Sequence, residues 1–353
     1  MPDAQIQAAI ANWQPRFVTN GVDVNDFTRI TSQLERWEDW LPAWEAHGDM
    51  LAQEAAAAEA GGRRESAWEY WRRASLSYHF GKFVWMVDKE LHKRASEKAV
   101  NALDQALRVL DPTAERLEIP FDGAKMVAIL RRPEGVERPP VVVIIPGLDS
   151  TKEEFFMTEE EFHRRGMATL TLEGPGQGET GFELPIRHDF EVAFSAALDF
   201  LAGRDDIDLD RVGTIGFSLG GYYAPRVAAF EPRCKAAVGL SGPYCLAHYW
   251  DERPPMTKET FRIHSAAANE EEAKLKAAEL TLEGVAETIT SPLLIITGDR
   301  DRLVPWQDTK RIADEARNST WKLFEGGNHV VNNMPYQYKT LSADWLRSHL
   351  VAA

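Results

Sequence analysis

The chain has 353 residues, of which 44% are hydrophobic and 27% are charged, and its formal net charge is −15. This length and composition predict a globular protein with one large domain and a smaller second one. The strong negative charge argues against nucleic acid or an anionic membrane as a partner.

Three further features bear on where the protein works. No apolar run approaches the roughly 20 residues that a membrane-spanning helix needs. The N-terminus lacks the basic-then-apolar pattern of a secretion signal. Only two cysteines are present, Cys234 and Cys245, and they lack metal-site spacing, which suits a reducing compartment. We therefore expect a soluble, cytoplasmic protein.

Residues 1–112 have the apolar periodicity of helices. Phe27, Ile30, Leu34 and Trp37, for example, fall on one helical face. This segment also contains seven of the eleven tryptophans: Trp13, Trp37, Trp40, Trp44, Trp68, Trp71 and Trp85. We interpret the segment as a helical N-terminal domain with a tryptophan-rich core. The alternative is that some of these aromatic residues, or Tyr78 and His79, form the wall of a cavity for an aromatic ligand.

After residue 112 the pattern changes to short β-branched runs, which from the third onward alternate with helical stretches. The runs are residues 116–121, 126–130, 141–147, 168–174, 211–218, 236–242 and 292–299. Such alternation predicts a mostly parallel sheet with helices on both faces, here over residues 113–353. The pattern breaks at about residues 243–291, and we interpret this stretch as a lid-like insertion over the strand ends.

One serine lies at a predicted strand-to-helix junction. Ser218 is the centre of Gly216-Phe-Ser-Leu-Gly220, which matches the G-x-S-x-G pattern of a nucleophile elbow. The glycines leave room for a sharp turn that lifts the hydroxyl above the sheet. The backbone N–H of Leu219, at the start of the helix, would then face an oxyanion formed by attack of the serine.

A serine needs a base, and two later strand ends supply candidates. His329 follows the strand-like run at 322–324, and Asp301 follows the run at 292–298. Polar residues at the carboxyl ends of parallel strands gather at one edge of the sheet. We predict His329 as the general base and Asp301 as its orienting carboxylate. Asp299 competes with Asp301 for the role of orienting carboxylate. Asp301 could instead be an ordinary surface carboxylate, and His329 an ordinary loop histidine.

Two glycine-containing loops follow earlier strands. In the first, we expect the N–H of Leu148 to be the second oxyanion donor, because Gly147 lets the backbone approach closely. The second loop, residues 173–178, resembles a phosphate cradle but lacks the Lys-Ser/Thr pair of a nucleotide site. We interpret it as a rim of the active site.

Together these motifs resemble the α/β-hydrolase superfamily. The segments 147–155, 165–179, 216–224 and 249–260 and the tryptophan-rich N-terminus further resemble the 2,6-dihydroxypseudooxynicotine hydrolase group. Polyketide-shortening hydrolases are related to that group, and FrsA-like esterases are more distant. The resemblance implies an α/β-hydrolase fold and a helical domain that helps close the active site. It also implies that the chain can form a homodimer, and that Ser218, Asp301 and His329 form a catalytic triad.

The resemblance also implies hydrolysis of a carbon–carbon bond next to a ketone, without a metal or organic cofactor. A carbon leaving group must be protonated as it departs, so an extra acid is expected. The resemblance points to the insertion, where Asp251 is the first candidate and Glu252 the second; both could instead be exposed lid residues. Tyr78, His79, Tyr222 and Tyr249 are candidate pocket residues.

Three functions therefore remain open from the sequence. The first is a serine hydrolase that cleaves an aryl ketone or 1,3-diketone, with a small aromatic or polyketide-like substrate. The second is a carboxylesterase or other acyl hydrolase with the same triad. The third is a binding module on a hydrolase scaffold, although such modules usually lose the histidine.

Overall fold

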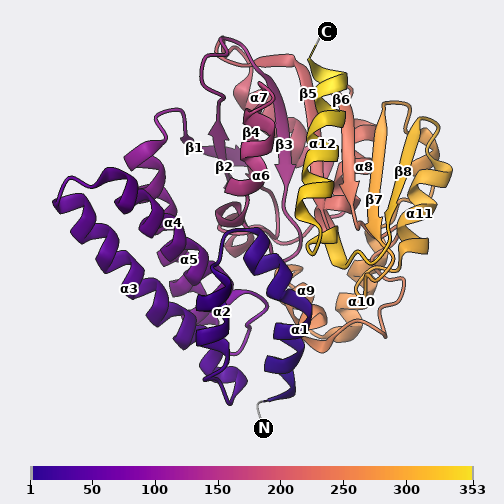
Figure 1. Ribbon diagram of the computed structural model, residues 1–353. Helices are drawn as coiled ribbons and strands as arrows, with labels where there is room; N and C mark the ends of the chain where they lie inside the picture. The colour runs from indigo at the N-terminus through magenta and orange to yellow at the C-terminus, as the bar shows by residue number, and fades with distance from the viewer. Residues whose placement is uncertain (1–2, 352–353) are drawn as a thin grey trace. The chain divides into compact units, whose positions relative to one another are not determined.

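The computed structural model describes residues 3–351, which form two compact units (Figure 1). The helical unit contains the chain up to Ala114 and the short segment Glu153–Met157. The sheet unit contains Glu115–Lys152 and the chain from Thr158 onward. Within residues 3–351 no helix combines the length and the apolar character needed to cross a lipid bilayer.

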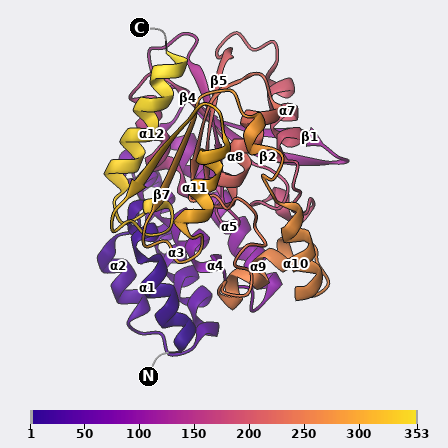
Figure 2. The same cartoon turned by 90° about the vertical axis from the view of Figure 1, so that its right-hand side faces the viewer.

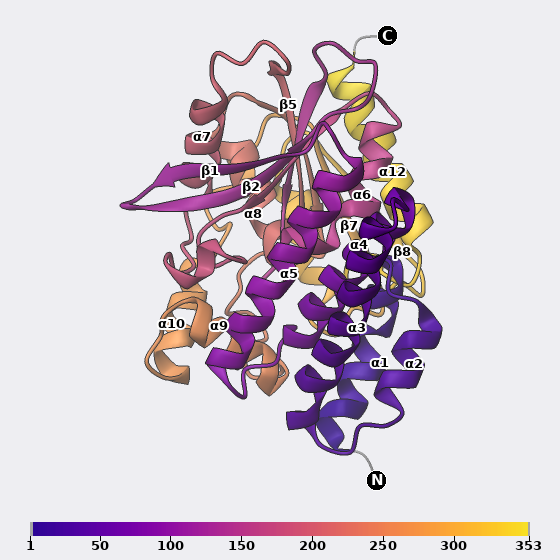
Figure 3. The same ribbon diagram turned by 90° about the vertical axis from the view of Figure 1, so that its left-hand side faces the viewer.

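The helical unit is built from five α-helices and one 3₁₀ turn: α1 (Ala4–Thr19), α2 (Val24–Thr31), η1 (Trp37–Asp39), α3 (Trp40–Ala60), α4 (Arg64–Lys82) and α5 (Lys89–Leu110). Helix α4 packs against both α3 and α5, as Figure 3 shows. Asp3, Asp23 and Asp88 cap the N-termini of α1, α2 and α5 by accepting backbone N–H groups.

An aromatic cluster forms the core of this unit. The Phe17 ring stacks on Phe80 at 4.0 Å between centroids and meets the edge of Phe27 at 5.2 Å. The buried Trp40 and Trp85 donate their indole N–H groups to backbone carbonyls, at 3.1 and 2.9 Å. Five of the seven N-terminal tryptophans are buried here, and large aromatic side chains of this kind contribute much apolar surface to a core.

The sheet unit contains eight strands: β1 (Glu115–Phe121), β2 (Ala124–Arg131), β3 (Pro140–Ile145), β4 (Ala168–Glu173), β5 (Asp208–Phe217), β6 (Cys234–Leu240), β7 (Leu293–Gly298) and β8 (Ser319–Phe324). Their order in the sheet is β1-β2-β4-β3-β5-β6-β7-β8. Strand β2 pairs antiparallel with β1 and β4, and every later pair is parallel. This is the expected α/β-hydrolase sheet.

Helices cover both faces of the sheet, as Figures 1 and 2 show. On one face lie α6 (Phe156–His163) and α12 (Pro335–Leu350), and on the other α7 (Phe190–Leu201), α8 (Leu219–Phe230) and α11 (Trp306–Glu315). Short 3₁₀ turns lie in the connections: η2 (Lys152–Glu154), η3 (Thr180–Phe182), η4 (Ala286–Thr288) and η5 (His329–Val331). Every residue of β3, β4 and β7 is buried, because both faces are covered.

The insertion after β6 contains two helices, α9 (Pro255–His264) and α10 (Glu270–Glu279). It is fixed to the loop that follows β4: His264 accepts the N–H of Ile186 at 2.8 Å through its carbonyl, and its Nδ1 lies 2.7 Å from the Gly176 carbonyl. Because β4 ends at Glu173, this attachment places part of the insertion at the carboxyl edge of the sheet.

The chain was expected to divide once, into residues 1–112 and 113–353. The structure differs in one respect, since Glu153–Met157 belongs to the helical unit although both of its flanks belong to the sheet unit. The reason is that Glu154 is buried with Arg16 and Asn20 of the helical unit, at 2.6 and 3.0 Å. No pattern in the sequence around residues 153–157 predicts that this segment belongs to the helical unit.

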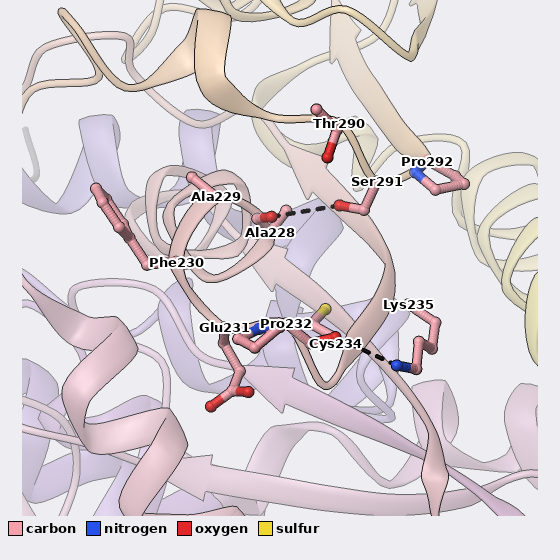
Figure 4. A pocket seen from close by; sticks show the side chains of 10 residues that line it. All are labelled: Ala228, Ala229, Phe230, Glu231, Pro232, Cys234, Lys235, Thr290, Ser291 and Pro292. Carbon is pink, nitrogen blue, oxygen red and sulfur yellow. Dashed lines mark hydrogen bonds between the residues drawn. The ribbon is translucent and has the colours of Figure 1, made fainter.

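Glu231 provides a pH-dependent contribution to stability. It follows α8, beside the shallow pocket of about 530 Å³ in Figure 4, and its carboxylate accepts Arg233 Nη2 and Ser195 Oγ, both at 2.6 Å. Burial alone would raise the pKa of Glu231, but the hydrogen bonds from Arg233 and Ser195 outweigh it and lower the pKa to about 2. The resulting stabilisation is complete above the pKa of an unfolded glutamate and is lost as the pH falls toward 2.

We therefore expect Glu231→Gln to lower Tm at pH 7 by roughly 2–4 °C. The difference from wild type should shrink as the pH falls below about 4.5, where the unfolded glutamate takes up its proton. Thermal unfolding followed by circular dichroism from pH 7 to pH 3 checks this, with the exposed Glu134→Gln as control. A Tm difference that stays constant over that range would contradict the assignment.

Candidate active site

Ser218 lies in a strained turn between β5 and α8. Its φ is +56°, a region that residues other than glycine rarely adopt. A Cβ on Gly216 would lie 1.8 Å from the Gly220 carbonyl oxygen, and a Cβ on Gly220 would lie 2.2 Å from the Ile145 carbonyl oxygen. Both glycines are therefore required by close backbone approach, as a nucleophile elbow demands.

The structure brings Ser218, His329 and Asp301 together at the carboxyl edge of the sheet. Ser218 Oγ lies 2.8 Å from His329 Nε2, and His329 Nδ1 lies 2.8 Å from Asp301 Oδ2. The Asp301 side chain is fully buried, and its Oδ1 accepts the N–H groups of Leu303 at 2.9 Å and Val304 at 3.0 Å. The carboxylate is thus fixed on both oxygens, which orients the imidazole toward the serine.

The turn that holds His329 is also strained. Val330 and Val331 have φ values of +58° and +55°, which are rare for β-branched residues. The Val330 N–H donates to Ser241 Oγ at 3.0 Å, and Ser241 itself has a φ of +47° directly after β6. A cost of order 1–3 kcal/mol at each such residue persists only where the surroundings impose it, and such residues cluster at functional sites.

Asp299, the competing carboxylate, has a different place. Its side chain is exposed and its Oδ1 accepts the Gly326 N–H at 2.6 Å. Asp299 therefore links the loops that follow β7 and β8, whereas Asp301 contacts the imidazole.

Two backbone segments converge on Ser218. Leu219 is the first residue of α8, so its N–H has no partner within the helix and lies at the positive end of the helix dipole. The β3 loop (residues 146–151) passes on another side, where a Cβ on Gly147 would lie 3.2 Å from Ser218 Cβ. Leu148 follows Gly147 directly, so its amide is close to the serine.

The β4 loop (residues 174–179) braces the β3 loop. Gln177 Nε2 donates to the Pro146 carbonyl at 2.5 Å, and the buried Glu173 accepts the N–H groups of Lys152 at 2.9 Å and Glu179 at 3.0 Å. A Cβ on Gly178 would lie 2.0 Å from the Glu173 carboxyl carbon, so the glycines make room for this side chain. The Glu173 carboxylate therefore occupies the interior of the β4 loop, and the β4 loop holds the backbone of the β3 loop in place.

The two predicted leaving-group acids lie at the surface. The Asp251 side chain is 78% exposed, and both of its oxygens lie 3.0 Å from Lys274 Nζ. Glu252 is also exposed. A carboxylate in solvent, already in contact with a lysine, is poorly placed to hand a proton to a buried carbon, so the expectation of an acid here finds no support.

The four predicted pocket residues have different surroundings, two in each unit. Tyr222 is buried in the sheet unit and donates its hydroxyl to the His188 carbonyl at 3.2 Å, whereas Tyr249 is 44% exposed in the insertion. Tyr78 and His79 lie inside the helical unit, where the Tyr78 hydroxyl donates to Asp49 at 2.7 Å. Both side chains are therefore part of the interior of that unit, where α4 packs against α3 and α5.

Three supporting residues were missed by reasoning from the sequence. Ser241 holds the histidine turn, and Glu173 and Gln177 hold the β3 loop. Ser241 carried a signal, since it follows a buried strand directly, as the triad residues do. Among residues 3–351 no group of three or more His, Cys, Asp or Glu side chains is arranged to hold a metal ion.

Comparisons with known proteins identify the family of the chain. Residues 30–350 match the family described as esterase FrsA-like. The 2,6-dihydropseudooxynicotine hydrolase of Paenarthrobacter nicotinovorans is 34% identical over 97% of this chain and 92% of its own length. The 20-hydroxy-prefusarin hydrolase FUS2 of Gibberella moniliformis is 36% identical over 62% of this chain, which spans only 55% of that relative.

The crystal structure of the 2,6-dihydroxy-pseudo-oxynicotine hydrolase superposes with a TM-score of 0.88 at 34% identity, covering 96% of each chain. The fold and the family resemblance expected from the sequence are both confirmed. The chain belongs to the esterase FrsA-like family of α/β hydrolases and is an enzyme of the hydrolase class.

Proposed function

We propose that this enzyme hydrolyses a carbon–carbon bond next to a ketone through an acyl-enzyme on Ser218. The observation that carries the proposal is the continuous hydrogen-bonded chain from Asp301 through His329 to Ser218, with both links at 2.8 Å. The names of two relatives, which act on 2,6-dihydropseudooxynicotine and on a prefusarin, support a small organic substrate. An aryl ketone or a 1,3-diketone fits this chemistry.

The first half of the reaction forms a tetrahedral intermediate. His329 Nε2 takes the hydroxyl proton of Ser218 while Oγ attacks the ketone carbon. The carbonyl oxygen becomes an oxyanion that accepts the N–H groups of Leu148 and Leu219. Asp301 stabilises the imidazolium and holds its Nδ1–H, without taking a proton itself.

The second half breaks the carbon–carbon bond. The bonding electron pair leaves on carbon as an enolate or electron-rich ring, and the carbonyl re-forms as an ester of Ser218. Because Asp251 and Glu252 lie at the surface, we assign the proton on the leaving group to the His329 imidazolium. Water then attacks the acyl-enzyme with His329 as base, which releases a carboxylic acid and restores the serine.

A carboxylesterase is the second candidate. The family description favours it, and so does the exposure of both predicted carbon acids, since an alkoxide leaves with no acid beyond His329. The kcat for p-nitrophenyl acetate, compared with that for a panel of aryl-substituted 1,3-diketones, separates the two functions. Diketone cleavage at a kcat comparable to or above that of the ester supports the proposal, and ester turnover alone supports the esterase.

For the triad, we expect Ser218→Ala and His329→Ala each to lower kcat by roughly 10⁴–10⁶-fold, because both the nucleophile and its base are required. Asp301→Asn should cost about 10³–10⁴-fold through the wrong imidazole tautomer. The matched control is Asp299→Asn on the same loop, which should stay within about tenfold of wild type. Stoichiometric labelling of Ser218 by a fluorophosphonate would exclude a non-catalytic binding module. A tenth of the activity left in the serine or histidine variant would refute the assignment.

For the surface acids, we expect Asp251→Asn and Glu252→Gln to keep kcat within about threefold of wild type on both ester and diketone, since neither carboxylate contacts the triad. Initial rates on the two substrate classes check this. Selective loss of diketone cleavage with normal ester turnover would show that the insertion supplies the acid and that His329 does not act alone.

A further inference from the structure

The chain leaves the sheet unit immediately after the β3 loop. Lys152 belongs to the sheet unit and Glu153 to the helical unit, and the chain returns to the sheet unit at Thr158. A single 3₁₀ turn, η2, spans this crossing from Lys152 to Glu154. The amide of Leu148 is thus separated by a few residues from a side chain that the helical unit holds.

That side chain is Glu154, which is 2% exposed. Its carboxylate accepts Arg16 Nη2 at 2.6 Å, Arg16 Nε at 2.9 Å and Asn20 Nδ2 at 3.0 Å. The ring of His79, fully buried, places Nε2 at 3.7 Å from Glu154 Oε2. Burial alone would raise the pKa of Glu154, but Arg16 and His79 outweigh it and hold this pKa well below its usual range.

The other end of η2 is held within the sheet unit. The Lys152 N–H donates to Glu173 at 2.9 Å, and Lys152 Nζ lies 2.7 Å from Glu179. The first residue of the β3 loop is held by Gln177, whose Nε2 donates to the Pro146 carbonyl at 2.5 Å. Polar contacts thus hold both ends of this segment: those of Pro146 and Lys152 within the sheet unit, and that of Glu154 within the helical unit.

A buried ion pair contributes little net stability, because desolvation of both charges offsets their attraction. A bidentate arginine–carboxylate pair does fix geometry, through two parallel hydrogen bonds. Oxyanion donors need such fixing, since misplacement of about 1 Å can cost a hundredfold in rate.

We propose that Arg16 and Glu154 are positioning residues for the oxyanion hole. Their ion pair fixes η2, η2 fixes the β3 loop, and the loop directs the Leu148 N–H toward the oxyanion on the carbon attacked by Ser218. The contribution of Arg16 is thus transmitted along the chain through η2. This inference rests on the proposed Ser218 chemistry and holds for ketone and ester substrates alike, because both pass through the same oxyanion.

The test compares Arg16→Met and Glu154→Gln with Arg131→Met in the full-length enzyme. Arg131 pairs with Glu159 at 2.7 Å and with Glu160 at 3.1 Å inside the sheet unit. The Arg131 and Glu159 side chains are 6% and 5% exposed, so this variant also leaves a buried glutamate without its arginine. The probes are p-nitrophenyl acetate as substrate and an aryl trifluoromethyl ketone, which forms a tetrahedral oxyanion adduct on a catalytic serine.

We expect Arg16→Met and Glu154→Gln to lower kcat by about 10–100-fold, with KM within about twofold. The Ki of the trifluoromethyl ketone should rise by a similar factor, because its adduct needs the same N–H groups. Arg16→Lys keeps the positive charge but cannot form the two parallel hydrogen bonds of a guanidinium. Its kcat and Ki should therefore lie between those of Arg16→Met and wild type. Arg131→Met should lower Tm comparably and leave kcat and Ki within about threefold of wild type.

A loss of Tm in Arg16→Met and Glu154→Gln with unchanged kcat and Ki would overturn the inference and leave the pair a purely structural one. If these variants do not fold, Asn20→Ala removes one hydrogen bond and keeps the ion pair. It should lower kcat about 2–5-fold at constant KM, and an unchanged kcat would overturn the inference. If Ser218→Ala retained p-nitrophenyl acetate hydrolysis, the proposed function would fall first, so the two failures are distinguishable.

Discussion

The hydrogen bond between His329 and Ser218 is the interaction on which the rest of the structure depends. It requires residues 111 positions apart to meet within 2.8 Å. The parallel sheet makes this meeting possible, because β5, β7 and β8 all end at one edge. Ser218, Ser241 and Val330 all have positive φ values at that edge, so local backbone strain accompanies the convergence of the side chains.

Much of this could be predicted from the sequence, for a physical reason. The G-x-S-x-G spacing reflects close backbone contacts that no side chain would allow: Gly216 with the Gly220 carbonyl inside the elbow, and Gly220 with the Ile145 carbonyl at the end of β3. Asp301 and His329 could be found because each follows a buried strand, and strand direction alone fixes which edge they reach. Asp301 was preferred to Asp299 on the same loop, and the two differ in the structure: Asp301 lies 2.8 Å from His329 Nδ1, whereas Asp299 accepts the Gly326 N–H.

What could not be predicted depends on side-chain direction and on distant partners. Tyr78 and His79 were candidate pocket residues because they are aromatic and close in sequence, yet helix packing turns both into the interior of the helical unit. Asp251 had the right chemistry but lies in solvent beside Lys274. Glu154 gave no signal, since a glutamate that directly follows Lys152 and Glu153 resembles part of a solvated surface and its partner Arg16 is 138 positions away.

The double crossing of the chain at residues 152–153 and 157–158 also bears on how the protein is made and how it can evolve. During synthesis the N-terminal helices cannot complete their interior until Glu154 has emerged from the ribosome, which is well after β3. Removal of the N-terminal residues by one cut or by gene fission would leave a charged side chain in the remaining enzyme without its counter-ion. The two units are therefore expected to be inherited together. Recombination at residue 114 would also have to change the connection between β3 and α6, because that connection contains Glu154.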